Sequence, residues 1–346
     1  NLTPGIYRRC MTHTSGSTDI SHAFTALRTG AGVSDLSASA GLDMPGSGWI
    51  AVTGDDRVRW LNGMVTNSVQ ALTTGEGAYT FLLSAQGRIQ GDATVWAEAD
   101  RLLLQTSADQ VAPMLTMLDR FIIMDDVELH DLSAEMHGLL IAGPLAVEKL
   151  QAVGIAARGS KLLKRQATTW RDRPVMLTNA YSLLVPRIEV WSQHAEDNAD
   201  LHKALLAEGV IPCDGAAVEL LRIAEGTPRF GKDIRDRDLP QETAQTRALH
   251  FNKGCYLGQE IVERIRSRGN VHRTFAAFLL HGDQPQPGTP LMADEKQVGE
   301  LTSVAAQQID GELLALGFVR REALERGQPL LYAGGSAEPR ARTAAS

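Results

Sequence analysis

The sequence predicts an α+β protein of two or three domains, and three observations support this fold class. Two regions that mix helical and extended patterns follow one another, and after about Val271 only short strands remain. The chain has 346 residues, of which 43% are hydrophobic, so it can bury more than one sizeable core.

The first mixed region runs from 49 to 133. Its first strand is expected at 49–52, and Gly54-Asp55-Asp56 then starts a helix with Val58, Leu61 and Val65 on one face. Alternation at 78–84, a turn at 85–87 and a second alternating run at 89–96 predict a hairpin. The other expected elements are a strand at 101–106, a helix to about 122 with Ser107 and Gln110 as a capping box, and a strand at 127–132. This order indicates a ferredoxin-like unit, an open sheet with helices on one face.

A second mixed region is expected to follow, because Gly143, Val147 and Leu150 repeat the spacing of Gly54, Val58 and Leu61, and each set comes just after a short apolar strand. Extended segments are expected around 174–178 and 181–190, and helices near 198–208 and 216–224.

The last region is predicted to be a small β-barrel. Strands are expected at 274–280, 298–305 and 313–319, separated by turn-rich stretches. We expect the polar end of the chain, from Gly334 to Ser346, to be disordered.

Composition excludes several classes of protein. The net charge of -7 argues against general nucleic-acid binding, although a local basic cluster remains open. Cys10, Cys213 and Cys255 form no C-x-x-C pair, and no closed set of four metal ligands is apparent, so we expect no disulfide framework and no metal site. No apolar run has the length of a membrane span, and a cytoplasmic protein without membrane contact is predicted.

The stretch that carries chemistry is K-G-C-Y-L-G-Q-E, at 253–260. Lys253 lies two residues before Cys255, and a nearby cation favours the reactive thiolate. Gly254 and Gly258 allow a tight bend around the thiol or a close approach to a ligand. The alternative for any free cysteine is a small buried apolar side chain. We predict Lys253 and Cys255 as functional residues; the rest of the motif is Gly254, Tyr256, Gly258, Gln259 and Glu260.

The segment F-N-K-G-C-Y-L-G-Q-E-I-V-E-R closely resembles the signature of the YgfZ-type folate-binding proteins. These are relatives of the glycine cleavage T-protein, an aminomethyltransferase, and assist iron-sulfur cluster assembly and repair. V-T-G-D-D-R-V-R-W-L-N-G-M-V-T-N, G-E-G-A-Y-T-F-L-L-S-A-Q-G-R-I-Q-G-D, L-P-Q-E and V-G-E-L-T-S also look like family segments. The resemblance covers nearly the whole chain.

The resemblance implies a three-domain ring with a central folate channel. Its first domain would be discontinuous, formed by 1–48 and 131–267, and 49–130 would be inserted as the second. The barrel would span 268–334, followed by a disordered tail at 335–346. The implied cofactor is tetrahydrofolate or a derivative.

A folate site needs a carboxylate or amide for the pterin, an apolar or aromatic wall and a cation for the glutamate tail. Asp92 lies on the hairpin face of Gln90, Thr94 and Trp96. The T-protein has an acidic doublet in this segment, whereas this chain reads Gly91-Asp92. The alternative for Asp92 is a solvated strand residue.

A second departure concerns Glu225. The family usually reads Glu-Ala-Gly after L-R-I, but this chain reads Ala224-Glu225-Gly226, and a shift of one residue turns a helical side chain by about 100°. Arg264, Arg266, Arg268 and Arg273 make a basic stripe that would hold the folate tail or an RNA or protein partner, or form a solvated face. The predicted folate contacts are Asp92, Asn67, Tyr79, Glu225, Arg264 and Arg266.

The leading hypothesis is a tetrahydrofolate-binding accessory factor for iron-sulfur proteins or their assembly factors, in which Cys255 supports thiol chemistry or transient partner contact. One alternative is a folate-dependent aminomethyltransferase that uses Asp92; the missing partner at Gly91 speaks against it. Another is a tRNA-modification helper that binds RNA through the arginine stripe.

Overall fold

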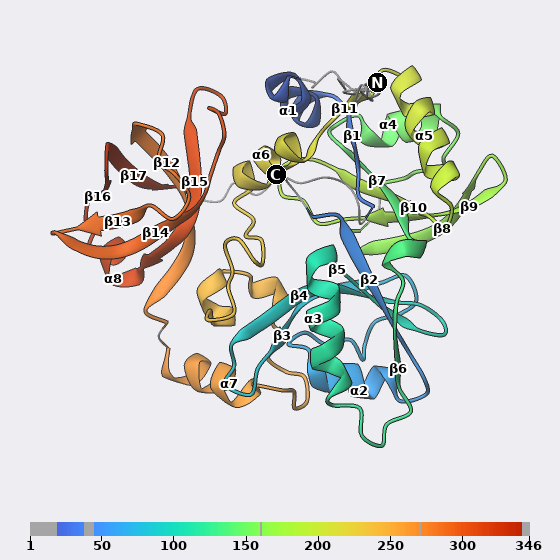
Figure 1. Cartoon of the computed structure of the whole chain (residues 1–346), viewed down its shortest axis with the longest axis horizontal. Helices are drawn as coiled ribbons and strands as arrows, with labels where there is room; N and C mark the ends of the chain where they lie inside the picture. Colours follow the sequence, from blue (N-terminus) through green and yellow to red (C-terminus); the bar gives the residue numbers. More distant parts are fainter. Residues whose placement is uncertain (1–18, 38–44, 160, 270, 341–346) are drawn as a thin grey trace, which may run out of the picture.

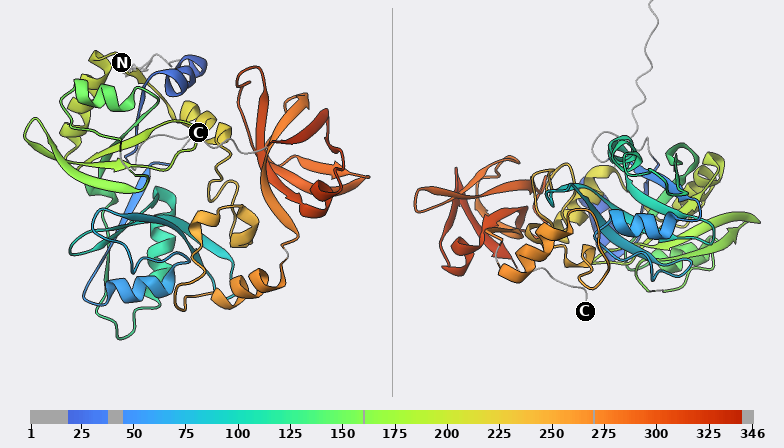
Figure 2. Two further views of the ribbon diagram at one scale, coloured as in Figure 1. Left: turned by 180° about the vertical axis from the view of Figure 1, so that it is seen from behind. Right: turned by 90° about the horizontal axis from the view of Figure 1, so that it is seen from below.

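The computed structural model describes residues 19–37, 45–159, 161–269 and 271–340. Two sheets with their helices and one barrel are arranged around a common centre (Figure 1). Seen from below, these three bodies lie side by side in a single layer (Figure 2). The predicted class is confirmed, because the chain combines mixed α and β units with a closed barrel near its C-terminal end.

One sheet has six strands in the order β11-β1-β7-β10-β9-β8. Its middle strand pairs are antiparallel, with Glu189 opposite both Leu140 and Thr178. The strands are β1 Gly32–Asp35, β7 His137–Ala142, β8 Lys164–Trp170, β9 Arg173–Asn179, β10 Arg187–Ser192 and β11 Ile211–Pro212. The helices beside it are α1 Ile20–Thr29, α4 Ala146–Ala152, α5 Ala195–Ala207 and α6 Gly215–Ala224.

The other sheet has five strands in the order β3-β4-β5-β2-β6. One face packs on its two helices around Leu61, Val95 and Met114, because residues of that face alternate with those of the other along each strand. The strands are β2 Ser47–Thr53, β3 Gly77–Leu83, β4 Ile89–Ala97, β5 Leu102–Ser107 and β6 Glu128–Asp131, and the helices are α2 Arg57–Met64 and α3 Ala108–Asp119. A short 3-10 turn, η1 at Ser133–Glu135, follows.

The barrel closes in the order β12-β15-β14-β13-β16-β17. Its last strand, Gly335–Arg340, pairs with β12 and β16 and completes the closure. The sequence prediction of a disordered tail is therefore corrected for 335–340; residues 341–346 lie outside the described residues. The other elements are β12 Arg273–Gly282, β13 Pro290–Ala293, β14 Lys296–Val304, β15 Leu313–Arg320, β16 Leu330–Tyr332 and α8 Arg321–Glu325.

The segment from 226 to 269 connects the three bodies and contains the K-G-C-Y-L-G-Q-E motif. It forms η2 Pro240–Thr243, η3 Thr246–Ala248 and α7 Gln259–Arg268. Tyr256 is buried with Phe81 and Ile89 of the β3–β4 hairpin. Gly258 has φ 79°, and a Cβ there would lie 2.6 Å from the carbonyl oxygen of Ser84, so only glycine fits. The motif thus packs against the turn of this hairpin.

Most predicted elements lie within a few residues of their observed positions. The segment 181–186 is a loop instead of a strand, because Pro186 ends the regular pattern before β10. Several observed elements were not predicted: α1, β1, β8, β11, α7, β13, β16 and α8. The capping box is not formed: Gln110 donates its Nε2 to the Ser107 hydroxyl at 2.9 Å and to Asp92. Among the described helices, none combines the length and apolar character needed to cross a membrane.

Candidate functional site

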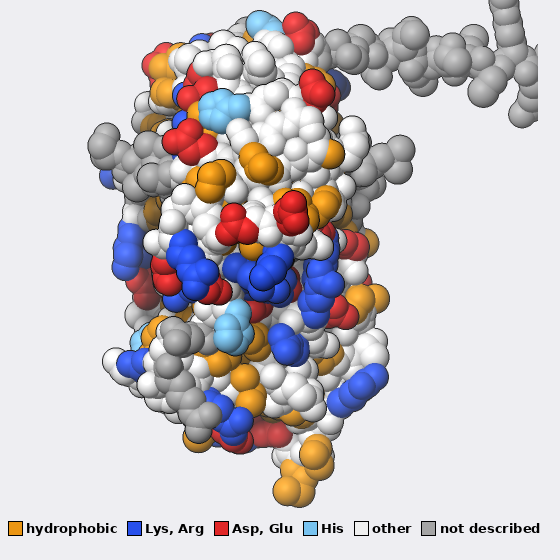
Figure 3. All heavy atoms as spheres, turned by 90° about the vertical axis from the view of Figure 1, so that its left-hand side faces the viewer, with side chains coloured by type: hydrophobic (Ala, Val, Ile, Leu, Met, Phe, Trp, Pro, Cys, Tyr) orange, Lys and Arg blue, Asp and Glu red, His pale blue; other side chains and the backbone are white. Residues whose placement is uncertain are grey.

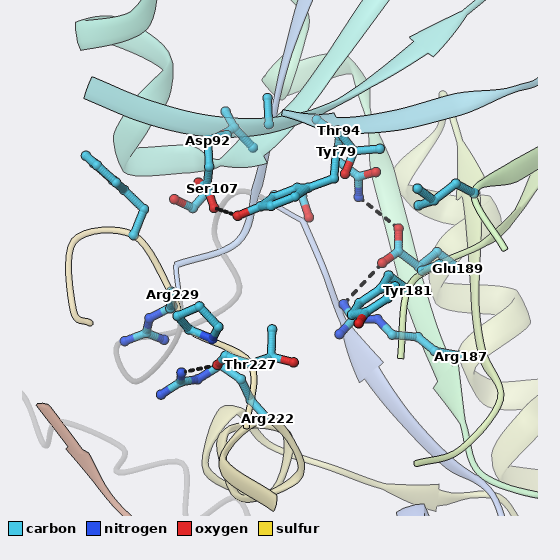
Figure 4. Close-up of a pocket in the computed structure, with 18 of the residues that line it drawn as sticks. Tyr79, Asp92, Thr94, Ser107, Tyr181, Arg187, Glu189, Arg222, Thr227 and Arg229 are labelled. Atoms are coloured by element: carbon cyan, nitrogen blue, oxygen red, sulfur yellow. Dashed lines mark hydrogen bonds and ion pairs between the residues drawn. The ribbon is translucent and has the colours of Figure 1, made fainter. Parts of the chain in front are cut away.

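A cavity of about 270 Å³ lies where the two sheets and the connecting segment meet. Its walls come from β3, β4 and β5, from β10 and the loop before it, from α6, and from the segment that follows α6. Figure 4 shows Asp92 and Tyr79 on one wall, Glu189 and Arg187 on the adjoining wall, and Arg222 and Arg229 across the cavity. Polar groups from distant parts of the sequence therefore face one space.

Asp92 is a half-buried carboxylate that lines this cavity. The Tyr79 hydroxyl donates to its Oδ2 at 2.7 Å, and Gln110 Nε2 donates to its Oδ1 at 2.9 Å. Burial raises the pKa of Asp92 above its ordinary value, because the charged form loses hydration. The strand holds its backbone firmly, since Thr106 Oγ1 donates to the Asp92 carbonyl at 2.7 Å. Asp92 is thus a fixed hydrogen-bond acceptor at the cavity wall.

Glu189 is the second carboxylate of the cavity and is buried, with 3% of its surface exposed. It accepts hydrogen bonds from Arg187 Nη2 at 3.1 Å, from Gln105 Nε2 at 2.8 Å and from Trp191 Nε1 at 3.1 Å. Because Arg187 and Glu189 are two residues apart on β10, both side chains lie on the same face of the strand. The ion pair with Arg187 offsets part of the cost of burying the Glu189 carboxylate.

A stack of three side chains forms another part of the wall. The Cζ atom of Arg247, on η3, lies 3.9 Å from the ring centre of Tyr79 and 3.7 Å from that of Tyr181. Tyr79 comes from β3 and Tyr181 from the loop between β9 and β10, so the stack joins three separate segments. Burial lowers the pKa of Arg247 from its ordinary value and raises that of Tyr79 well above 10.

Two arginines line the opposite side. Arg222, on α6, is paired with Glu219 at 2.7 Å and with the fully buried Asp233 at 2.6 Å. The Arg229 Nη1 lies 3.6 Å from Glu219 and has no hydrogen-bond partner among the described residues. This side of the cavity therefore offers a cation to an anionic ligand group.

Comparison with known proteins identifies the family. The model of the family described as the GCVT N-terminal domain matches residues 4–253. The chain belongs to this family. Among curated relatives of this GCVT-family protein is the "Putative transferase At1g60990, chloroplastic" of Arabidopsis thaliana, 26% identical over 288 residues. This match covers 83% of the chain and 66% of the relative, so the chain spans just under two thirds of that relative's length.

Two bacterial relatives are covered more fully. The chain is 27% identical over 314 residues to an aminomethyltransferase of Rippkaea orientalis, covering 88% of the chain and 82% of the relative. It is 24% identical to an aminomethyltransferase of Staphylococcus haemolyticus, over 84% of the chain and 81% of the relative. The crystal structure of the glycine cleavage system aminomethyltransferase T from Bartonella henselae shares the fold, with TM-score 0.81, 20% identity, and coverage of 92% and 87% of the two chains.

Position 91 of this GCVT-family chain faces away from the cavity. Gly91 lies beside Asp92 on β4, so a side chain there would point to the opposite face of the sheet. A Cβ at Gly91 would lie 3.0 Å from Cε of Met114 and 3.1 Å from Oε1 of Gln110, both on α3. A carboxylate at position 91 would therefore not reach the cavity. The glycine at this position is a weaker argument against an aminomethyltransferase than the sequence suggested.

Three predicted folate contacts, Asp92, Tyr79 and Glu225, line the cavity. Glu225 ends α6, and its Oε1 accepts from the Ser182 hydroxyl and from the backbone N–H of Leu183 at 3.1 Å. It thereby fixes the loop that carries Tyr181. Asn67 lies behind the wall, where its Nδ2 donates to the carbonyls of Tyr79 at 2.8 Å and Arg247 at 2.9 Å.

Lys253 and Cys255 are not among the residues that line the cavity. The Lys253 amine donates to the carbonyls of Val65 at 2.7 Å and Asn67 at 2.6 Å, so it ties the motif to the segment after α2. Burial lowers the pKa of Lys253 to about 7. Cys255 is exposed, and no contact between its thiol and this amine is observed within the described residues. A chemical role for the two residues stays a prediction.

The other motif residues shape the start of α7. The N–H of Tyr256 donates to Gln259 Oε1 at 3.2 Å, and Glu260 pairs with Arg264 one turn along the helix. An added Cβ at Gly254 would meet no atom within 4 Å, so packing does not require glycine there.

The predicted arginine stripe is not continuous. Arg264 and Arg266 lie on helix α7, so their side chains point about 200° apart around its axis. Arg273, on β12, is paired with Asp238 at 2.5 Å and Glu242 at 3.0 Å. Figure 3 shows Lys and Arg side chains in a band across the face that carries the barrel. A hollow at this side is lined by Arg235, Arg237, Arg273 and Arg320.

Sequence reasoning missed Glu189, Arg187, Tyr181 and Arg247. One signal was present for the first two: R-I-E-V-W places two opposite charges on one face of a strand that is otherwise apolar. An inward-facing ion pair in a buried strand marks a candidate site. Tyr181 and Arg247 carried no such signal, because both lie in irregular segments that only the tertiary fold brings together.

Proposed function

We propose that the cavity binds a reduced folate, tetrahydrofolate or a derivative. The observation that carries this proposal is a pair of carboxylates, the half-buried Asp92 and the buried Glu189, on adjoining walls of one cavity in a GCVT-family chain. Carboxylates accept hydrogen bonds only, as the N–H groups of a pterin require. When bound, the folate would supply a carrier for a one-carbon unit.

The remaining lining residues fit the other parts of a folate. Tyr79 and Tyr181 offer aromatic surface for the ring system. Arg229 offers a cation to the glutamate carboxylates on the far side. The volume of about 270 Å³ is near the lower end of small-molecule sites, which begin at about 300 Å³, so the ring system would be enclosed and the tail would extend outward.

The test is calorimetry with tetrahydrofolate on the wild type, Glu189→Gln and a control, Glu128→Gln. Glu128 is also a strand glutamate, but it is exposed on β6. Loss of a charge-assisted hydrogen bond predicts that Glu189→Gln binds roughly tenfold or more weakly, and that the control binds like the wild type. If the wild type shows no affinity for reduced folates, the proposal fails.

We further propose that the protein acts as an accessory factor for iron-sulfur proteins or their assembly factors. Two observations support this role: the resemblance of K-G-C-Y-L-G-Q-E to the YgfZ-type signature, and the exposure of the Cys255 thiol. An exposed thiol outside the folate cavity is available to a protein partner while the cavity is filled.

A deletion strain tests this role. Cys255→Ala and Lys253→Ala are expected to restore little activity of iron-sulfur enzymes. The control is Cys213→Ala, at a cysteine in the core, and it should restore enzyme activity in proportion to the amount of variant protein in the cells. Full rescue by both Cys255→Ala and Lys253→Ala would remove the thiol from the mechanism.

A folate-dependent aminomethyltransferase is the second candidate. It is favoured by the two bacterial relatives of that name, which the chain matches over more than four fifths of their length. Asp92 would then position the folate that receives the aminomethyl group. Folate-dependent release of ammonia with a lipoylated carrier protein discriminates the two; robust turnover would place the transferase first.

A further inference from the structure

Arg247 differs from the other arginines of the cavity in its partners. Arg187 is paired with Glu189, Arg222 with Glu219 and Asp233, and Arg229 lies near Glu219. For Arg247, the described residues provide one hydrogen-bond acceptor, Gln245 Oε1, at 3.2 Å from Nε. Both terminal nitrogens are left without an acceptor.

The nearby carboxylates are already engaged. Asp92 accepts from Tyr79 and Gln110, and Glu225 accepts from the loop at 182–184. Both attract Arg247 through space, but neither is hydrogen-bonded to it within the described part of the chain. The Arg247 side chain is half-buried at the cavity wall, so its unpaired terminal donors are available to a ligand that supplies acceptors.

The stack fixes the direction of these donors. Two rings at 3.9 Å and 3.7 Å hold the guanidinium flat, and Asn67 anchors the backbone carbonyls of both Tyr79 and Arg247. Because the planar group cannot rotate freely between the rings, its terminal N–H groups are presented in one plane at the cavity wall. A guanidinium has donors only, so the matching part of the ligand must carry acceptors.

We propose that Arg247 is a ligand-binding residue that determines specificity, donating from its terminal nitrogens to the 4-oxo edge of the pterin and discriminating against 4-amino analogues. This inference rests on the proposed folate binding. The remaining lone pairs of Asp92 and Glu189 accept from the N–H groups of the ring, and Arg247 donates to its carbonyl oxygen. A 4-amino group would place a donor against a donor, which leaves both groups unsatisfied.

The test compares the dissociation constants of tetrahydrofolate and its 4-amino counterpart, tetrahydroaminopterin, by calorimetry on the full chain. The wild type is expected to prefer the 4-oxo ligand by roughly tenfold or more. Arg247→Leu is expected to lose that preference by weakening tetrahydrofolate alone. Arg171→Leu is the control, because Arg171 also lies over an aromatic ring, 4.6 Å from the ring centre of Trp170, but is not among the residues that line the cavity.

A purely structural role for Arg247 would weaken both ligands equally and leave the ratio unchanged in Arg247→Leu, which would overturn the inference. Tighter binding by Arg247→Leu would overturn it as well, since the guanidinium would then block the cavity. If Arg247→Leu does not fold, Tyr181→Leu removes one side of the stack and is expected to reduce the ratio; an unchanged ratio contradicts the inference. A wild type that binds neither ligand refutes the folate proposal instead.

Discussion

Replacing Gly91 by aspartate recreates the acidic doublet of the T-protein in sequence, but the fold predicts damage instead of a second cavity carboxylate. Position 91 faces α3, and its Cβ would lie 3.0 Å from Met114 Cε and 3.1 Å from Gln110 Oε1. The new carboxylate would therefore lie against α3 beside the hydrophobic core under β4, where its charge would be buried among apolar side chains.

The expected loss of stability has two parts. A single added methyl group meets only the ends of two flexible side chains, so Gly91→Ala should cost roughly 1 kcal/mol, the low end for overpacking. In Gly91→Asp, a buried charge without a partner adds roughly 3–5 kcal/mol to the loss of stability. The variant reduces this loss if the new carboxylate takes up a proton. Gly91→Asp also pushes Gln110 off Asp92, so the affinity for tetrahydrofolate should fall as well.

Urea unfolding of the wild type, Gly91→Ala and Gly91→Asp measures the stability, and calorimetry with tetrahydrofolate measures the affinity. The alanine variant separates crowding from charge. If Gly91→Asp unfolds at the same urea concentration as the wild type and binds tetrahydrofolate more tightly, position 91 faces the cavity. The orientation of strand β4 described above would then be refuted.

Two further predictions concern the motif and its cysteine. Cys255 is exposed, whereas Cys213 is buried and its pKa is raised to about 12 by burial. A thiol reagent at neutral pH should therefore label Cys255 but not Cys213 in the native protein, and both of them in urea. Rapid labelling of Cys213 in the native protein, read by peptide mass spectrometry, would contradict the fold. The pKa of Lys253 is lowered to about 7 from 10.5, so between these values the unfolded state binds more protons and this residue makes stability rise with pH. Stability measured from pH 6.5 to 9.5 should therefore rise more steeply in the wild type than in Lys253→Met, and equal slopes would show that the amine is not buried.

The parts of the fold that the sequence could predict are those governed by local periodicity. The hairpin was expected at 78–84 and 89–96 and is observed at Gly77–Leu83 and Ile89–Ala97, because alternation and a short turn define it locally. The repeat was also informative: Gly54 and Gly143, with φ 93° and 126°, each follow a strand and precede a short helix. Left-handed φ at both positions explains why glycine recurs there.

Predictions failed where a long-range contact decides the structure. Strand β17 looks like a polar tail, and it is ordered because β12 and β16 supply its hydrogen bonds across the closed barrel. Long-range contacts also decide the site. Asp92 was predicted from its strand face, but Arg247 became part of the cavity only because Tyr79 of β3 and Tyr181 of the loop before β10 stack on it.

The central claim is that the half-buried Asp92 carboxylate belongs to a folate-binding cavity. Calorimetry with tetrahydrofolate on the wild type, Asp92→Asn and Asp109→Asn tests it most directly, since Asp109 is an exposed aspartate at the start of α3. We predict that Asp92→Asn lowers the affinity roughly tenfold or more while Asp109→Asn binds like the wild type. Equal affinity of all three proteins, each shown to be folded, would contradict the account.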